Sequence, residues 1–282
     1  MSRSDKYPKL VVDLDKLRRN IDRIRIQCED KGVEIAGVIK GCTGLTECAR
    51  QFAREGCRFI ASSRLEQLET LRSSGIQTQL MMIRVPMLSE VADVVRVTDI
   101  SLNSEIAVLK ALNEEAGAQD KEHQVILMVD LGDLREGFWD KDELLEAALL
   151  TENELHNLKL AGIGTNLGCY GAVAATPEKL EELVEAAPDR AEVFRRRRLD
   201  VYIFARHIQR VRDIVHHLFA VRAHLWFLHN DRAVDVDDLI TILAQQITDL
   251  TQQTDRINVL IFGIGIRKQP ANIPQPRRAQ KR

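Results

Sequence analysis

The chain of 282 residues lacks any run of 18 consecutive apolar residues, and its opening segment, Met-Ser-Arg-Ser-Asp-Lys-Tyr-Pro, has no apolar stretch of the kind found in secretory signals. These absences predict a protein without a membrane span, and the expected location is the cytoplasm. Hydrophobic residues make up 45% of the chain and charged residues 29%, which excludes a wholly disordered protein.

Cysteine is scarce, and no two of the five cysteines are spaced as Cys-x-x-Cys. An odd number of cysteines without such pairs fits a reducing compartment better than a disulfide framework. We therefore expect free thiols at all five positions, which are Cys28, Cys42, Cys48, Cys57 and Cys169.

Glycine, lysine and glutamate become rare after Ala187. Residues 1–187 carry 23 Lys and Arg against 32 Asp and Glu, a net charge of −9, whereas residues 188–282 carry 17 against 10, a net charge of +7. Of the 15 glycines, only Gly263 and Gly265 lie after this point. The change in composition predicts a division into a first region, 1–187, and a divergent Arg/His-rich region, 188–282.

Short apolar runs alternate with amphipathic helical stretches through the first region. An opening strand over 10–14 and a helix spaced by Leu14, Leu17, Ile21 and Ile24 are expected first. The strands predicted after them cover 33–39, 58–61, 80–85, 100–102, 125–129 and 158–165. The helices predicted between them cover 45–54, 65–72, 90–95, 105–116, 142–150 and 177–186.

This alternation indicates a parallel sheet, either doubly wound or closed into a barrel. No Gly-x-Gly-x-x-Gly follows the first strand, which weakens the case for a doubly wound dinucleotide-binding fold. Six units in about 155 residues agree with the number of residues per unit in a (β/α)8 barrel. We predict an α/β protein of this TIM type, incomplete, with a helical or irregular C-terminal segment in place of the last strands. Residues 258–266 are a candidate strand for one open edge, and 201–204 is judged too short for the other.

Polar residues at the carboxyl ends of these strands are the candidates for chemistry. Lys40 closes an apolar strand, where loss of water would favour a neutral, nucleophilic amine for a carbonyl cofactor. The alternative is a lysine that extends to solvent. Arg135 lies in a loop with two glycines and can bind a phenolate, carboxylate or phosphate, or else pair with Asp133 or Glu136 for structural reasons.

Six blocks in order resemble the alanine/ornithine racemase family over about residues 7–187. They are 7–20 (Tyr-Pro-Lys-Leu-Val-Val-Asp at its start), 38–41 (Val-Ile-Lys-Gly), 84–87 (Arg-Val-Pro-Met), 99–105, 128–137 (Met-Val-Asp-Leu-Gly-Asp-Leu-Arg-Glu-Gly) and 162–171. The resemblance implies a barrel that binds pyridoxal 5′-phosphate, a following β-domain, and a homodimer that acts on a small amino acid.

The resemblance also implies roles for individual residues. Lys40 matches the lysine that forms the Schiff base and acts as one base at the substrate Cα, and Arg135 matches an arginine bonded to the phenolic oxygen of the cofactor. Asn166 falls where alanine racemases stack a histidine, and asparagine there resembles the ornithine branch. Further pocket candidates from the matching blocks are Arg84, Asn103 and Tyr170.

The region after Ala187 departs from the family. Neither a Ser-Gly-Gly-Asn-Ser-like phosphate loop nor an Arg-x-Gly-Glu-like strand end occurs there. The run Arg195–Arg198 has no aromatic stacking pattern, so nucleic acid is not the expected partner. His217 and His224 lack acidic or cysteine partners at ligand spacing, so no metal site is predicted. A helical replacement or a shifted reading frame would account for the change.

The sequence therefore predicts an amino-acid racemase of ornithine or alanine type. Two alternatives stay open: a pyridoxal phosphate-binding carrier that does not racemise, and an inactive, truncated racemase. The first fits the absence of a recognisable β-domain, and the second fits the absence of a recognisable phosphate loop.

Overall fold

The computed structural model describes residues 11–29, 33–167, 173–174, 176–186, 200–205 and 257–262. Its strands are β1 (Val33–Val38), β2 (Phe59–Ser62), β3 (Gln79–Met82), β4 (Ile100–Asn103), β5 (His123–Met128), β6 (Leu158–Leu167), β7 (Asp200–Ala205) and β8 (Ile257–Phe262). Its helices are α1 (Leu14–Glu29), η2 (Lys40–Cys42), α2 (Thr46–Arg54), α3 (Leu65–Ser73), η3 (Leu88–Glu90), α4 (Val91–Val97), α5 (Ile106–Ala118), α6 (Lys141–Asn153) and α7 (Pro177–Ala186).

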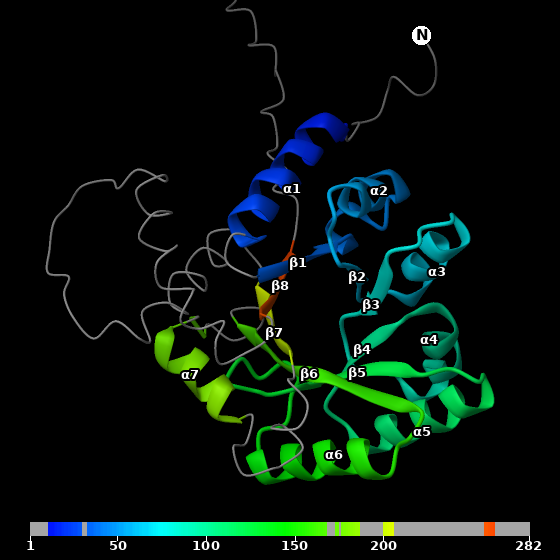
Figure 1. Ribbon diagram of the computed structural model, residues 1–282, viewed down its shortest axis with the longest axis vertical. Coiled ribbons are helices and arrows are strands. Elements are labelled where there is room, and N and C mark those ends of the chain that lie inside the picture. Colours follow the sequence, from blue (N-terminus) through cyan, green and yellow to red (C-terminus); the bar gives the residue numbers. More distant parts are fainter. Residues whose placement is uncertain are drawn as a thin grey trace, which may run out of the picture.

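The eight strands pair in parallel and in chain order, and β1 pairs with β8 to close the barrel. The helices lie around the outside of the strands (Figure 1). The α/β barrel prediction is confirmed, including all six strand-helix units of the first region. The edges that six units would leave open are covered by β7 and β8. The prediction that 201–204 is too short was wrong, because β7 extends over six residues beside the long strand β6.

The expected opening strand over 10–14 is also wrong. Residues 11–13 have no regular structure, and α1 begins at Leu14. The side chain of Asp13 accepts a hydrogen bond from the Lys16 backbone amide at 3.0 Å. Asp13 therefore caps an exposed helix N-terminus, and this local bond outweighs the β propensity of the preceding Val-Val pair.

Two apolar clusters divide the strands between an inner and an outer face. One cluster fills the barrel interior, and its members lie on the strands or directly after a strand. Its buried members are Ala36, Val38, Phe59, Ala61, Met81, Ile83, Ile100, Leu102, Ile126 and Met128. On β1, β2, β3 and β5 the neighbours of these residues face the helices and pack with them in the second cluster. This alternation follows from the two-residue period of a strand.

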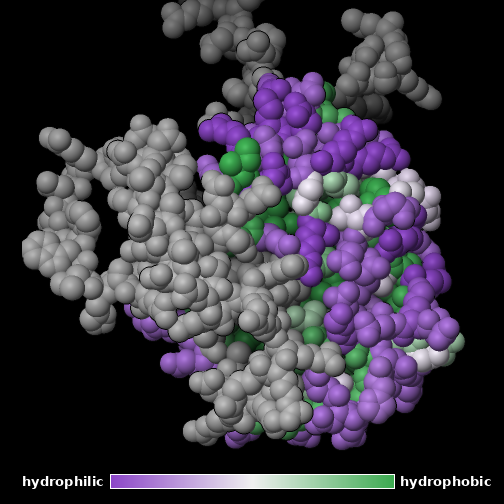
Figure 2. Space-filling model, viewed as in Figure 1, coloured by the Kyte–Doolittle hydropathy of each residue, from purple (hydrophilic) through white to green (hydrophobic). Residues whose placement is uncertain are grey.

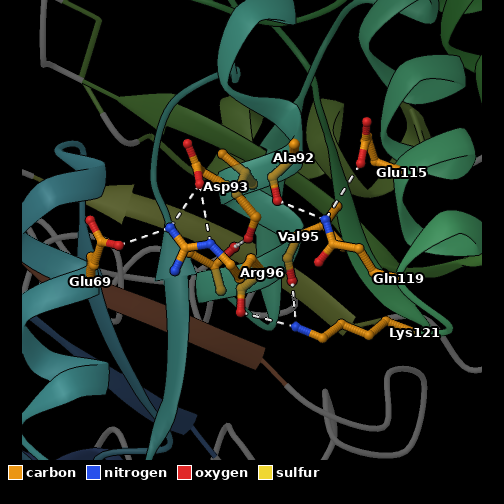
Figure 3. Close-up of polar contacts among 10 residues, drawn as sticks. Glu69, Ala92, Asp93, Val95, Arg96, Glu115, Gln119 and Lys121 are labelled. Atoms are coloured by element: carbon orange, nitrogen blue, oxygen red, sulfur yellow. Dashed lines mark hydrogen bonds and ion pairs between the residues drawn. The ribbon is translucent and has the colours of Figure 1, made fainter.

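Polar contacts at the surface join α4 to α3 and to the segment just after α5 (Figure 3). Arg96 of α4 bonds Glu69 of α3 at 2.8 Å and Asp93 at 2.7 Å. Lys121 donates to the carbonyl groups of Val95 and Arg96 near the end of α4. A cation at this end of a helix stabilises the last carbonyls. In Figure 2 the visible helices present mainly hydrophilic side chains, with hydrophobic residues between them.

No helix in the part of the chain that the structure describes is long and apolar enough to cross a bilayer. Four of the five cysteines lie in this part, and all four are free thiols, as predicted. Cys169 lies outside the described residues.

Candidate active site

Lys40 lies two residues after the end of β1, at the start of η2 and at the carboxyl end of the barrel, and it is half-buried. The chain turns sharply at this point. The carbonyl of Ile39 accepts hydrogen bonds from the amides of Cys42 and Gly44, both at 3.1 Å. Thr43 and Gly44 both have positive φ angles, 53° and 77°. The turn therefore holds Lys40 at the mouth of the barrel.

The loop between β5 and α6 is closed at its base by two backbone hydrogen bonds between Phe138 and the strand end. Phe138 donates to the carbonyl of Met128 at 2.8 Å, and its own carbonyl accepts from Asp130 at 3.1 Å. The Asp130 carboxylate accepts from the amides of Gly132 at 2.8 Å and Leu134 at 3.1 Å. These bonds shape the loop before any ligand binds.

Arg135, Glu136 and Asn166 form a ring of side-chain bonds across the ends of β5 and β6. Arg135 Nε lies 2.7 Å from Glu136 Oε2. The Asn166 amide group donates to Glu136 Oε1, and Arg135 Nη1 donates to Asn166 Oδ1 at 3.4 Å. The ion pair between Arg135 and Glu136 that the sequence left as one alternative is thus present, and it is part of a larger network.

Burial raises the pKa of Glu136, and the neighbouring Asp133 raises it further. The charge of Arg135, the hydrogen bond from Asn166 and the charge of Lys40 act in the opposite direction without cancelling the effect of burial. The structure brings together Arg135 and Asn166, which the sequence predicted, and adds Glu136, which the sequence considered only as a structural partner of Arg135. Lys40 lies at the same end of the barrel.

Arg84 and Asn103 make their bonds elsewhere. Arg84 forms an ion pair with Glu90 and donates to the carbonyl of Ser63 at 2.9 Å. Asn103 donates to the carbonyl and the hydroxyl of Ser101 at 3.0 and 3.1 Å. Its buried Oδ1 has no hydrogen-bond partner among the described residues. Tyr170 lies outside the described residues.

An open cavity of about 670 Å³ lies beside the ring at the carboxyl end of the barrel. It is lined by Val85, Ser104, Glu105, Asp130, Leu134, Arg135, Glu136, Gly137 and Trp139. Among the described residues of this lining, three carry carboxyl groups and one carries a guanidinium, which is already paired with Glu136. Within the described ranges, no three His, Cys, Asp or Glu residues gather as a metal site.

A closed parallel barrel with an amine, a guanidinium and carboxylates at its carboxyl end defines the class of (β/α)8 barrels that place their ligand sites there. The family model described as "Alanine racemase, N-terminal domain" matches residues 12–199, and the chain belongs to this family.

Two curated relatives each match about two thirds of the chain. An ornithine racemase of Acetoanaerobium sticklandii is 40% identical over 183 residues, which are 65% of this chain and 51% of the relative. A lysine racemase of Thermotoga maritima is 31% identical over 179 residues, which are 64% of this chain and 49% of the relative. The chain thus spans about half the length of these relatives.

Solved structures of low sequence identity share the fold. An alanine racemase of Clostridium difficile 630 in complex with cycloserine has a TM-score of 0.57 at 20% identity, covering 69% of this chain and 56% of that one. A D-threonine aldolase from Filomicrobium marinum has a TM-score of 0.59 at 17% identity, covering 70% of this chain and 56% of that one.

The residues at one end of the site fit pyridoxal 5′-phosphate. An amine at a strand end can condense with its aldehyde, and a guanidinium fits its phenolic oxygen. Lys40 and Arg135 supply these groups at the carboxyl end of the barrel, where Asn166 is bonded to Arg135. The sequence after Ala187 has no Ser-Gly-Gly-Asn-Ser-like loop for the phosphate.

Proposed function

We propose that this protein is a pyridoxal 5′-phosphate-dependent amino-acid racemase of ornithine type. The observation that carries the proposal is the hydrogen bond between Arg135 and Asn166 at the carboxyl end of the barrel, the end that also carries Lys40, in a chain of the alanine racemase family. The alanine type is the second candidate, which the solved alanine racemases favour at the level of the fold.

Each residue has a proposed task. Lys40 holds the cofactor through its Nζ atom and, as a base, takes or returns the Cα proton on one face of the substrate. Arg135 binds the phenolic oxygen, and Asn166 keeps the guanidinium of Arg135 in place through the 3.4 Å bond. Bound here, the cofactor supplies the electron sink that makes the Cα proton acidic.

The carboxylates of the cavity support a substrate with a cationic side chain. Glu105 and Asp130 line the cavity together with the apolar surfaces of Leu134 and Trp139. An aliphatic chain that ends in an ammonium group matches this combination of apolar and negative surface. The names of the two curated relatives, ornithine racemase and lysine racemase, agree with such a substrate.

We also propose a homodimer. Four large apolar side chains are exposed on the loops after β3 and β5 at the mouth: Met87 (58%), Leu88 (58%), Leu134 (65%) and Trp139 (70%). Exposed apolar surface of this kind is common at protein interfaces. Light scattering of the purified protein measures the mass in solution, and a monomer at all concentrations would refute the dimer.

Two alternatives compete with this proposal: a carrier that binds the cofactor without racemising, and an inactive partial racemase. The observation that favours these two is that the chain spans about half the length of the curated relatives. A carrier would bind the cofactor and exchange no Cα proton. An inactive remnant would do neither.

Absorption spectra and mass spectrometry separate the three functions. Pyridoxal 5′-phosphate is added to the wild type, to Lys40→Ala and to Lys159→Ala, whose lysine is exposed on β6. We expect a new absorption band, and a mass adduct on the Lys40 peptide after borohydride reduction, in the wild type and Lys159→Ala but not in Lys40→Ala. Deuterium uptake at Cα of L- or D-ornithine, but not of alanine, identifies the ornithine type; a band without uptake identifies the carrier. A wild type with neither band nor adduct refutes the proposal.

A further inference from the structure

The turn that carries Lys40 is in contact with the first turn of α3. Gly44, at the end of the Lys40 turn, has a φ of +77°, and a Cβ atom built on it would lie 2.7 Å from Cγ of Gln67 and 3.0 Å from its Cβ and Cδ. The aliphatic part of the Gln67 side chain therefore packs directly against the backbone of Gly44. Glycine fits this position because it has no side chain to collide with the glutamine.

Gln67 is itself held by Ser62, the last residue of β2. The Ser62 hydroxyl donates to Gln67 Oε1 at 2.6 Å and accepts from the backbone amide of Arg64 at 3.1 Å. Ser62 is fully buried. Because this buried hydroxyl uses both its donor and its acceptor, its orientation is fixed, and it fixes the orientation of the Gln67 side chain in turn.

Hydrogen bonds within the turn connect Gly44 to the backbone on both sides of Lys40. The carbonyl of Ile39 accepts from the amides of Cys42 and Gly44, both at 3.1 Å, and the carbonyl of Lys40 accepts from the amide of Thr43 at 3.3 Å. A displacement of Gly44 must therefore stretch or break a bond to the residue that precedes Lys40. The contact with α3 thus acts on the backbone that carries the Lys40 amine.

We propose that Gln67 is a positioning residue for Lys40. Its stem packs against Gly44, its amide oxygen accepts from Ser62, and these two contacts fix the place at which the lysine amine meets an aldehyde. The inference rests on the proposed function for the identity of that aldehyde, pyridoxal 5′-phosphate. A reacting group that is misplaced by about 1 Å loses on the order of 10²-fold in rate, so a contact of this kind has a measurable effect.

Three variants of Gln67 separate its two contacts. Gln67→Met keeps an unbranched stem against Gly44 but loses the oxygen that accepts from Ser62. Gln67→Glu keeps the stem and an acceptor oxygen, and Gln67→Ala loses both. The matched control is Gln77→Ala, because Gln77 is an exposed glutamine whose side chain donates only to the nearby carbonyl of Gly75 among the described residues.

Hydrogen exchange, measured by mass spectrometry, reports on the turn without any ligand. The amides of Cys42, Thr43 and Gly44 are bonded within the turn, so they exchange when it opens. We expect exchange about tenfold faster in Gln67→Ala, because a lost side-chain hydrogen bond changes an equilibrium by a factor of up to about ten. Gln67→Met should be intermediate, and Gln67→Glu and Gln77→Ala should be close to the wild type.

The strand β5 is the internal reference for this measurement. Its amides should exchange at the wild-type rate in every variant, because β5 does not contact the turn. Unchanged exchange of the turn in Gln67→Ala overturns the proposal. An equal rise in the turn and in β5 also overturns it, because such a rise reports a general loss of stability.

Reductive labelling compares a large aldehyde with a small one at Lys40. The neutral amine condenses with pyridoxal 5′-phosphate or acetaldehyde and releases water, and cyanoborohydride then delivers hydride to the carbon–nitrogen double bond. A displaced amine still reacts with acetaldehyde, whereas the larger aldehyde must also fit the groups around it. We expect the ratio of pyridoxal 5′-phosphate to acetaldehyde labelling to fall about tenfold in Gln67→Ala and to stay near the wild-type value in Gln67→Glu.

The two measurements distinguish failure of this inference from failure of the proposed function. Faster exchange of the turn in Gln67→Ala, with a wild type that pyridoxal 5′-phosphate does not label, supports the hold of Gln67 on the turn and refutes the cofactor. A labelled wild type with an unchanged labelling ratio in Gln67→Ala refutes the positioning role and keeps the cofactor. If Gln67→Ala has no cooperative unfolding transition, Gln67→Met is judged in its place by the same two criteria.

Discussion

Nε2 of His123, the first residue of β5, lies 2.9 Å from the hydroxyl oxygen of Ser101 on the neighbouring strand β4. His123 is buried, and burial is the main reason that its pKa falls from 6.5 to about 4. The nearby charge of Lys121 lowers it as well, whereas Asp99 acts in the opposite direction. The imidazole is therefore neutral in the folded protein at neutral pH.

The first prediction concerns acid stability. Between pH 6.5 and 4 the unfolded chain protonates His123 and the folded protein does not, so the free energy of unfolding falls as the pH falls, by on the order of 3 kcal/mol from this residue. Urea unfolding at pH 7 and pH 4.5 should show a smaller loss in His123→Gln than in the wild type. His156→Gln, which changes an exposed histidine, is the control and should lose as much as the wild type.

The second prediction concerns the ion pair of Arg84 and Glu90, whose side chains are 28% and 15% exposed. Burial tends to raise the pKa of Glu90, but Arg84 and the Met87 amide outweigh it, so that the pKa is lowered. Arg84→Met leaves Glu90 without its charged partner and should lower the free energy of unfolding by about 2 kcal/mol at neutral pH, between the costs for exposed and buried pairs.

The matched control for Arg84 is Arg96→Met. Arg96 pairs with Glu69 and Asp93 at a surface where each of these side chains is about half exposed (Figure 3). Exposed pairs contribute little, so this change should cost less than about 1 kcal/mol. If both variants lose the same free energy of unfolding, the ion pair of Arg84 contributes no more to stability than an exposed pair.

The third prediction concerns Gly137. Alanine there would place a Cβ atom 2.4 Å from the Asp130 nitrogen, so the loop must move. We expect Gly137→Ala to lose cofactor binding, measured by absorption, along with more than about 2 kcal/mol of stability. Gly75→Ala meets no atom within 4 Å and has a φ of +80°, so it should cost about 1–2 kcal/mol and keep binding. Retained binding in Gly137→Ala would refute the importance of this loop geometry.

The fourth prediction concerns thiol reactivity. Burial raises the pKa of Cys28, Cys48 and Cys57 to about 12 in each case. Since the thiolate is the reactive form, these three thiols should resist iodoacetamide at pH 8 in the folded protein and react fully in urea. Peptide mapping by mass spectrometry measures each site separately. Rapid alkylation of any of the three in the folded protein would contradict their burial.

The order and type of most elements followed from local pattern. Six apolar runs and the helical stretches between them predicted the strands β1 to β6 and their helices. This was possible because the spacing of apolar residues that is typical of a strand or a helix is visible within a short stretch of sequence. The start of the chain was predicted wrongly, because a single capping bond at Asp13 decides between strand and helix there. The strand β7 was rejected on its length, although its pairing with β6 and β8 depends on residues far away in the chain.

The sequence by itself determined the parallel α/β architecture and placed Lys40, Arg135 and Asn166 at strand ends, because strand and loop positions can be counted along the chain. Only the tertiary structure decided that Glu136 joins them, that Arg84 is bound to Glu90, and that β8 closes the barrel against β1. Side chains thirty residues apart, such as Glu136 and Asn166, meet only when parallel strands align their carboxyl ends, and this contact depends on strand register and loop shape rather than on local propensity.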